Sequence, residues 1–200
     1  VGVKPAAGNE RGAAASVSEL VCNLLATELG LSAPQPFLVT IPQGFDALVN
    51  DEEVRMQFAN ASGPQFGCEY VAGQTISVPH RGVAKEKREE ALSVLLFDAL
   101  IQNADRRNEK PNILEHSDGY LLIDHDLALT CFGGMIIGGP TKPWVANHIA
   151  GGSFEFLKRH IFYAGLCGKD VEAEAFNTLL GGLTESKLEA IISTVPNGWW

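Results

Sequence analysis

The order of apolar and turn-forming segments predicts an α+β protein with two lobes, residues 1–73 and residues 74–200. Short strands and one long helix come first, and a mostly helical part that holds a small hairpin follows. The chain has 200 residues, of which 46% are hydrophobic and 20% are charged. This composition supports a packed core and argues against general disorder.

In the first lobe, residues 1–5 are expected to end a strand, and a flexible loop follows. A helix is expected over residues 16–29, where Ser16 or Ser18 could cap its start and Gly30 would stop it. Three further segments complete this lobe: a proline-bounded strand at 33–42, a polar and helical insertion at 45–61, and a strand with a glycine turn at 66–73.

In the second lobe, a charged helix is expected over residues 85–102. Its inward face would carry five apolar residues, Leu92, Leu95, Leu96, Leu100 and Ile101. Two short strands joined by the turn HSDG should form a hairpin. The remaining segments are expected to be the hairpin strands at 112–115 and 120–123, a glycine-rich loop at 131–140, and helices at 152–163, 170–180 and 185–193.

The gross chemistry excludes several classes of protein. A formal net charge of -9 and a pI near 5.0 lack the basic footprint of a nucleic-acid binder. No apolar run reaches the roughly 18 residues that span a bilayer, and no signal peptide is visible. The four cysteines form no CxxC pair, which favours reduced and mostly buried thiols. We therefore expect a cytoplasmic protein, and since the chain starts at Val1 we expect residues upstream.

The segment between the long helix and the hairpin carries the strongest chemical pattern. Asp105 follows the helix, and Asp124 ends the apolar strand YLLID, so the hairpin between them can bring both carboxylates together. One carboxylate could orient a hydroxyl nucleophile and the other could hold Mg²⁺, to which Asn112 could add a neutral oxygen. The alternative is an ordinary loop with solvated charges.

Two further features suit a nucleotide. Lys4 on the first strand and Glu19 on the following helix could form an ion pair that directs the ammonium at phosphates. The strand FGCEYVAG could present backbone groups to a base. Alone, the first pattern is more typical of an ordinary surface ion pair, and the second is equally typical of a plain core strand.

Together these residues resemble the HipA-like kinases and, more distantly, the phosphatidylinositol kinases. The resemblance rests on VKP, SELVCNLLATELGLSAPQP, FGCEYVAG, FDALIQNADRRNEKPNIL, LLIDHDLAL and VPNGWW. It implies a two-lobed protein-kinase-like fold whose first lobe is small, β-rich and incomplete, and an ATP- and Mg²⁺-dependent phosphotransferase.

The resemblance also implies a role for each matched residue. Lys4 would contact the ATP phosphates and would be steadied by Glu19. The hinge for adenine would be formed by Glu69, Tyr70 and Val71. Asp105 would be the catalytic carboxylate, and Asp124 would hold Mg²⁺, with His125 and Asp126 beside it.

The chain departs from the family pattern where a metal-binding asparagine is expected, because Lys110 stands there. Asn112 or Asn108 could substitute, and Asn112 is favoured since it lies on the hairpin that leads to Asp124. The phosphate-covering loop that the resemblance implies is not in this sequence, so that either it lies upstream of Val1 or the chain is incomplete as a nucleotide site. Three functions stay open: a Ser/Thr protein kinase acting on an unidentified acceptor, a nucleotide-binding or partner-binding pseudokinase, and a small-molecule or lipid kinase.

The remaining histidines and tryptophans are expected to be structural. His125 could either be structural or steer Asp124. Surface or satisfied core positions are expected for His80, His116, His148 and His160, and packing positions for Trp144, Trp199 and Trp200.

Overall fold

The computed structural model describes residues 1–71, 75–76, 82–116, 119–129 and 155–200. These residues combine helices with two small sheets, in agreement with the α+β prediction. The strands are β1 (Gly2–Lys4), β2 (Pro36–Thr40), β3 (Pro64–Cys68), β4 (Thr75–Ile76), β5 (Ile113–His116) and β6 (Gly119–Leu122). The α-helices are α1 (Ala13–Glu28), α2 (Glu52–Ala59), α3 (Arg88–Leu100), α6 (Tyr163–Leu166), α7 (Glu174–Gly181) and α8 (Glu185–Ser193). Short 3₁₀ helices are η1 (Ala6–Gly8), η2 (Phe45–Leu48), η3 (Lys85–Lys87), η4 (Glu155–Arg159) and η5 (Asn197–Trp199).

The first sheet has the antiparallel order β1-β3-β2, with Phe66 of β3 opposite both Lys4 and Leu38. Pro36 and Pro64 stand at the first positions of their strands, where a missing backbone N–H is tolerated. The predicted strand in the segment 66–73 is present as β3, which begins two residues earlier, at Pro64, and ends at Cys68.

Helix α1 forms the buried centre of this region. It begins at Ala13, after Gly12 with φ of 54°, and no side chain caps it. The predicted caps were therefore wrong, and Ser16 and Ser18 are buried inside the helix. Gly30 ends the helix as expected, with φ of 70°, and its N–H donates to the Thr27 carbonyl over 3.0 Å.

The second sheet has the order β4-β5-β6, and its hairpin confirms the predicted strands to within one residue. Helix α3 packs beside it, and the predicted face is confirmed in part: Ile101 is buried and Leu96 packs against the core. Leu100 is 44% exposed, and the buried face carries Ala91, Val94, Phe97 and the polar Asp98. The prediction of the inward face of α3 relied on apolar residues, so it did not include Asp98, whose carboxylate lies on the buried face.

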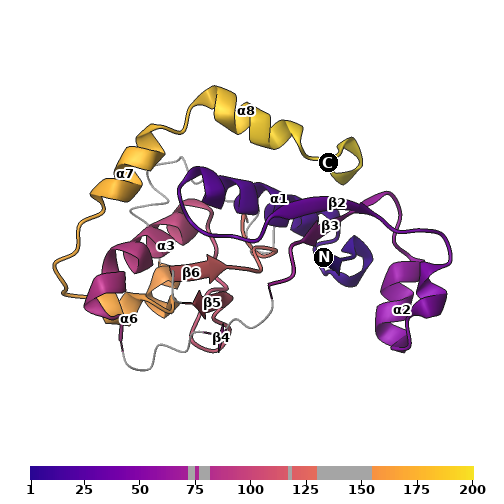
Figure 1. The fold of residues 1–200 in the computed structure, drawn as a ribbon, viewed down its shortest axis with the longest axis horizontal. Helices are drawn as coiled ribbons and strands as arrows, with labels where there is room; N and C mark the ends of the chain where they lie inside the picture. The colour runs from indigo at the N-terminus through magenta and orange to yellow at the C-terminus, as the bar shows by residue number, and fades with distance from the viewer. Residues whose placement is uncertain (72–74, 77–81, 117–118, 130–154) are drawn as a thin grey trace.

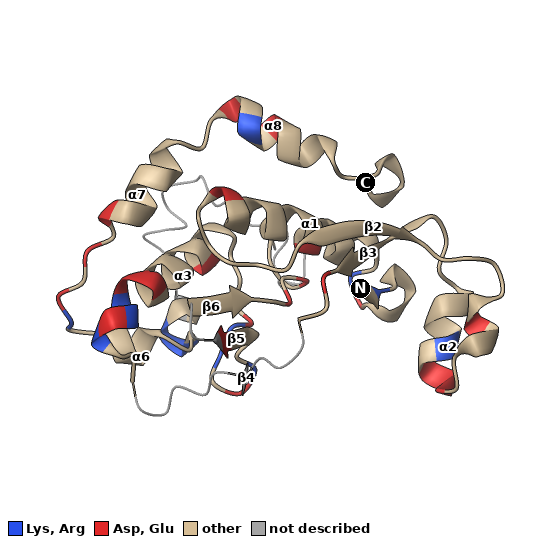
Figure 2. Ribbon diagram, viewed as in Figure 1, with Lys and Arg blue, Asp and Glu red and all other residues tan. Residues whose placement is uncertain are grey.

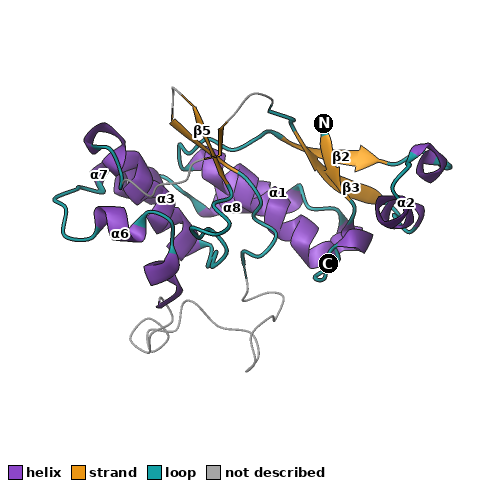
Figure 3. Ribbon diagram, turned by 90° about the horizontal axis from the view of Figure 1, so that it is seen from below, coloured by secondary structure: helices purple, strands orange, loops and turns teal. Residues whose placement is uncertain are grey.

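The two sheets lie along α1, with α2 beyond the first sheet and α3 and α6 beyond the second (Figures 1 and 3). Helix α8 matches its predicted range and packs on α1. Beyond α8, Trp199 is buried and its Nε1–H donates to the Pro64 carbonyl over 3.0 Å. Trp200 is 67% exposed, which corrects its predicted packing role.

Charged residues of both signs lie on α2, α3 and α8, whereas α1 and α7 carry only acidic ones (Figure 2). None of the helices in the described ranges has the length and apolar character needed to cross a membrane. Of the cysteines described, all three are free: Cys22 is buried, Cys68 is half-buried and Cys167 is exposed, so these thiols are less buried than expected. Some predictions concern positions outside the described residues: the loop at 131–140, Cys131, His80, His148 and Trp144.

Candidate active site

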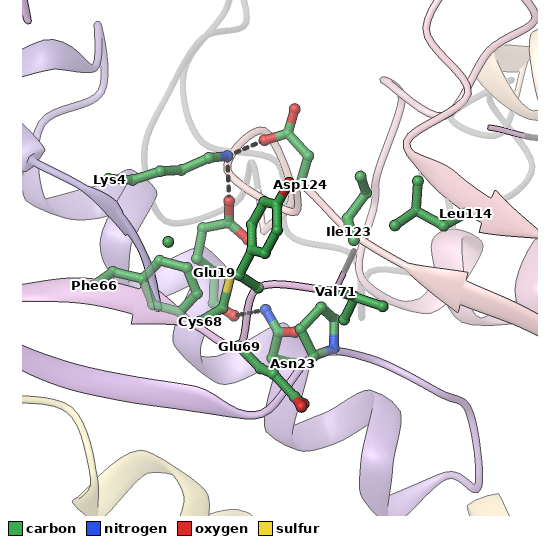
Figure 4. A pocket seen from close by; sticks show the side chains of 13 residues that line it. Lys4, Glu19, Asn23, Phe66, Cys68, Glu69, Val71, Leu114, Ile123 and Asp124 are labelled. Carbon is green, nitrogen blue, oxygen red and sulfur yellow. Dashed lines mark hydrogen bonds and ion pairs between the residues drawn. The ribbon is translucent and has the colours of Figure 1, made fainter. Parts of the chain in front are cut away.

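A cavity of about 350 Å³ is lined by residues from both sheets and from α1 (Figure 4). Lys4, Glu19 and Asp124 lie at one part of its wall. The segment Glu69–Val71, predicted to be a hinge, lines another part. Leu114 and Ile123 of the hairpin region supply apolar surface. The cavity thus combines an apolar wall with a few charged groups, as small-molecule sites do.

The Lys4 ammonium joins the two carboxylates of this wall. Its Nζ lies 2.5 Å from Glu19 Oε1 and also donates to Asp124 Oδ1. Burial by itself would lower the pKa of Lys4, but the charges of Glu19 and Asp124 outweigh burial and raise it. For Asp124, burial by itself would raise the pKa. The positive charges of the neighbouring Lys4 and Lys110 outweigh burial, so the pKa of Asp124 is lowered. The ammonium and the carboxylate therefore both stay charged near neutral pH.

Asp105 lies in the first half of the loop between α3 and β5 and is 5% exposed. Its Oδ2 accepts from Lys110 Nζ over 2.7 Å and from Asn112 Nδ2 over 3.2 Å, and its Oδ1 accepts from Arg107 Nη2 over 3.1 Å. Its backbone N–H donates to Asn103 Oδ1 over 3.1 Å. The carboxylate is thus held from several sides.

Asn112 and Asp124 flank the hairpin in matching backbone conformations. Their φ angles are 51° and 60°, in the left-handed region that asparagine and aspartate tolerate better than most residues. The Ile123 N–H donates to the Asn112 carbonyl over 3.1 Å, which places these two ends of the hairpin beside each other. Lys110 completes the group, since its Nζ also lies 2.9 Å from Asp124 Oδ2.

A buried polar cluster lies behind this loop. Asp98 accepts from Arg106 Nε over 2.6 Å, from Asn103 Nδ2 over 3.1 Å and from His160 Nε2 over 2.8 Å. Arg106 Nη1 in turn donates to the Asn112 carbonyl. The cluster therefore ties α3 and the segment before α6 to the backbone between Asp105 and Asn112. His160 is the satisfied core histidine that the sequence indicated.

His125 is completely buried and has a structural position. Its ring packs edge-on against Phe97, with 6.0 Å between centroids, and its backbone N–H donates to Glu19 Oε2 over 2.9 Å. Burial lowers the pKa of His125 to about 3, with a smaller contribution from Arg106. The imidazole is therefore neutral near pH 7, and the residue supports Glu19 through its backbone.

Three residues near the N-terminus hold the segment after Asp124. Asn9 Nδ2 donates to Asp126 Oδ2 over 2.9 Å. Arg11 Nη1 and Ser18 Oγ both donate to the Ala128 carbonyl, over 2.9 and 3.0 Å. The sequence indicated no role for Asn9 and Arg11 and indicated Ser18 only as a helix cap, and nothing in their spacing signals that they reach a segment more than a hundred positions away.

The structure thus arranges the predicted residues in two linked groups. Lys4, Glu19, Asp124 and the segment Glu69–Val71 line one cavity. Asp105 and Asn112 are absent from its lining and connect to it through Lys110, which bridges Asp105 and Asp124. Asn108, the alternative metal ligand, is exposed. The sequence indicated Lys110 only as a departure from the asparagine of the family pattern. It did not predict that Lys110 contacts both Asp105 and Asp124.

Among the described residues, no group of three or more His, Cys, Asp or Glu side chains is placed to hold a metal. An ion here would rest on one carboxylate and an amide, and Mg²⁺ commonly accepts few protein ligands and keeps waters.

Comparison with known protein families identifies a match over most of the chain. A family described as HipA-like kinase matches residues 5–133, well over half of the chain. The matched range contains Glu19, Asp105, Asn112 and Asp124 and starts one residue after Lys4. No curated protein matches the chain.

Proposed function

The chain belongs to the HipA-like kinase family, which indicates a kinase-type phosphotransferase, and we propose that it transfers the γ-phosphate of ATP to a serine or threonine hydroxyl of a protein. The observation that carries this proposal is a single cavity that combines a lysine–carboxylate cluster with an adjoining apolar wall. The acidic overall charge of -9 favours a protein acceptor over an anionic lipid surface.

In this proposal Lys4 binds the nucleotide phosphates and Glu19 holds its side chain in place. Glu19 is well suited to this role because its side chain is only 4% exposed and one oxygen is fixed by the His125 N–H. When phosphates enter, Lys4 can turn from Asp124 toward them while keeping Glu19 as a partner. The ammonium would then neutralise charge on the phosphates.

The base would lie against the segment Glu69–Val71. The Glu69 N–H is already used, because it donates to the Gln35 carbonyl over 2.9 Å. Base recognition therefore falls to the backbone of Tyr70 and Val71, with Phe66, Leu114 and Ile123 as the apolar wall. Tyr70 is 75% exposed, so its side chain can cover a bound base without first leaving a packed position.

The residues present fit a divalent cation. The Lys110 ammonium contacts carboxylate oxygens of both Asp105 and Asp124. A cation at this position can therefore interact with both carboxylates at once. Asp124 and Asn112 would hold Mg²⁺, which when bound neutralises charge on the transferring phosphoryl group. Asp105 would accept the hydrogen bond of the acceptor hydroxyl and orient it.

Transfer of label from γ-³²P-ATP in the presence of Mg²⁺ tests this function, with a library of serine and threonine peptides as acceptors. Asp105→Asn and Asp124→Asn should each reduce transfer by about a hundredfold or more. Asp170→Asn, at an exposed loop position, is the matched control and should retain activity. Absence of transfer with every acceptor would contradict the proposal.

A nucleotide-binding pseudokinase is the second candidate, because Lys110 rather than a metal ligand contacts both carboxylates. Thermal-shift titration separates the two functions. Stabilisation by ATP that requires Mg²⁺ supports the kinase. Equal stabilisation with and without Mg²⁺, together with absent transfer, supports the pseudokinase.

A further inference from the structure

Lys110 occupies a shared position between two acidic groups of the site. Its Nζ lies 2.7 Å from Asp105 Oδ2 and 2.9 Å from Asp124 Oδ2. The two carboxylates come from opposite sides of the hairpin, and Lys110 lies on the loop that precedes it. One flexible side chain therefore supplies the positive charge for both groups.

The neighbouring contacts leave little room for a second cation. Lys4 takes Asp124 Oδ1, and Lys110 takes Asp124 Oδ2, so each oxygen of this carboxylate is paired with an ammonium. Asn112 Nδ2 donates to the same Asp105 oxygen that Lys110 contacts, over 3.2 Å. An ion bound between Asp124 and Asn112 would thus lie on the side where Lys110 now is.

We propose that Lys110 is a tethered cation that occupies the metal position in the ligand-free protein and competes with the divalent ion for Asp124. This inference rests on the proposed function, in which Asp124 and Asn112 hold the metal. Displacement of Lys110 is feasible because its side chain is 47% exposed and keeps Asp105 as a partner after leaving Asp124. Lys4 has the equivalent second partner in Glu19.

The competition has a consequence for the order of binding. Metal alone must displace an ammonium that then loses one of its two carboxylates. When a nucleotide enters with the metal, its phosphates give the displaced ammonium a new anionic partner. Lys110 therefore makes metal and nucleotide favour each other's binding, and that coupling is reciprocal. Metal alone should bind weakly, and metal with nucleotide should bind well.

Mn²⁺ binding to the nucleotide-free protein, measured from the EPR signal of the free ion, tests the competition. Lys110→Met keeps the length of the side chain and removes its charge, and it should bind Mn²⁺ roughly three- to thirtyfold more tightly than wild type. Lys110→Arg should bind like wild type. Lys187→Met is the matched control, because Lys187 is 48% exposed and pairs with Glu28 over 2.9 Å, and it removes the same charge elsewhere.

Adding ATP completes the test. In wild type, ATP should tighten Mn²⁺ binding more than it does in Lys110→Met, because the variant has lost the displaced ammonium. Equal Mn²⁺ affinity of the nucleotide-free wild type and Lys110→Met would overturn the competition. So would a gain in nucleotide-free Mn²⁺ affinity in Lys187→Met as large as that in Lys110→Met. If wild type binds no Mn²⁺ with or without ATP, or Asp124→Asn binds it as well, the metal assignment of the proposed function fails and the inference fails with it.

A measurement on the wild-type protein does not depend on any variant folding. Acetylation of lysines by a soluble ester, quantified by mass spectrometry, reports how available each amine is. Saturating Mn²⁺ should increase labelling of Lys110 and leave Lys187 unchanged. Unchanged labelling of Lys110 while Mn²⁺ is bound would overturn the inference.

Discussion

The Arg106 guanidinium and the Asp98 carboxylate form an ion pair whose side chains are both completely buried, with 2.6 Å between Nε and Oδ2. The same guanidinium donates through Nη1 to the carbonyl of Asn112. The pair thus connects helix α3 to the loop that carries Asp105. A buried pair of this kind holds a loop in one conformation, but it leaves an uncompensated charge when either partner is removed.

Removing the guanidinium should therefore be costly. We expect Arg106→Met to lower the free energy of unfolding by about 3–5 kcal/mol, measured by urea denaturation. Arg55→Met is the matched control, because Arg55 pairs with Glu52 on the exposed helix α2 and should lose less than about 1 kcal/mol. A loss at Arg106 no greater than that at Arg55 would contradict the structural role of the buried pair.

The acid stability of the protein should also depend on Asp98. Burial alone would raise the pKa of Asp98, but Arg106 and His160 overcome burial and lower it from 3.8 to about 2. Above pH 3.8 the carboxylate is charged in both states and contributes its full stabilisation. As pH falls from 3.8 to about 2, the unfolded chain takes up the proton first, so that stabilisation is lost.

The check is urea denaturation of wild type and Asp98→Asn across this range. The difference in their free energies of unfolding should be constant above about pH 5 and should shrink by about 2 kcal/mol toward pH 2. Asp170→Asn, at an exposed position, should keep a constant difference from wild type. A difference for Asp98→Asn that stays flat or grows as pH falls would show that the carboxylate is not held ionised.

His160 should act on the site through Asp98. The Phe162 N–H donates to His160 Nδ1 over 3.2 Å, so Nδ1 is an acceptor and the ring proton lies on Nε2, which donates to Asp98. His160→Gln can keep the donor to Asp98, whereas His160→Leu removes one of the two donors to the buried Asp98 Oδ2 and leaves Arg106 Nε as the other. We expect His160→Leu to lose about 1–3 kcal/mol of stability.

Activity measurements distinguish positioning by His160 from general destabilisation. If the loop that carries Asp105 shifts, kcat for phosphoryl transfer should fall while KM for ATP changes little, because His160 is absent from the cavity lining. His160→Gln should restore most of kcat. A His160→Leu variant that is destabilised but transfers phosphate normally would restrict the residue to folding.

Local sequence patterns were sufficient for much of this fold. Helix α8, the hairpin and the stop of α1 at Gly30 follow from apolar periodicity and glycine turn chemistry, which depend on neighbours in sequence. The face of α3 followed only in part, because periodicity counts apolar residues and the buried stripe includes Asp98. That carboxylate is buried only because Arg106 and His160 reach it.

The residues of the candidate site also differ in whether local sequence patterns were sufficient to predict them. Asp105 and Asp124 could be selected because each lies at the end of an apolar element and the hairpin returns one toward the other. The bridging position of Lys110 could not be predicted, since it depends on distances to two carboxylates that only the folded loop sets. Comparison with the family pattern considers only the type of residue at position 110. The contacts of Lys110 depend instead on how far its side chain extends toward the two carboxylates.

The roles of Lys4 and Glu19 can be separated by their different partners. Lys4→Met removes the proposed phosphate ligand and also leaves Glu19, whose side chain is 4% exposed, without its cation. Glu19→Gln keeps the shape of the side chain and leaves Lys4 paired with Asp124 and, over 3.9 Å, with Asp126. We expect Lys4→Met to lower phosphoryl transfer by about a hundredfold or more. Glu19→Gln should lower it less, because a Lys4 ammonium without the Glu19 carboxylate can still reach the phosphates part of the time.

The double variant Lys4→Met with Glu19→Gln tests whether Glu19 acts only by positioning Lys4 or also contributes to transfer without it. If Glu19 acts only by holding Lys4, then Glu19→Gln should cost nothing further in the Lys4→Met background, as the double-mutant cycle requires for coupled residues. Transfer rates and ATP affinities of the four proteins give both terms of the cycle, and Lys187→Met serves as the charge control. Fully additive losses would mean that Glu19 contributes to the site without Lys4, through its bond to the His125 N–H.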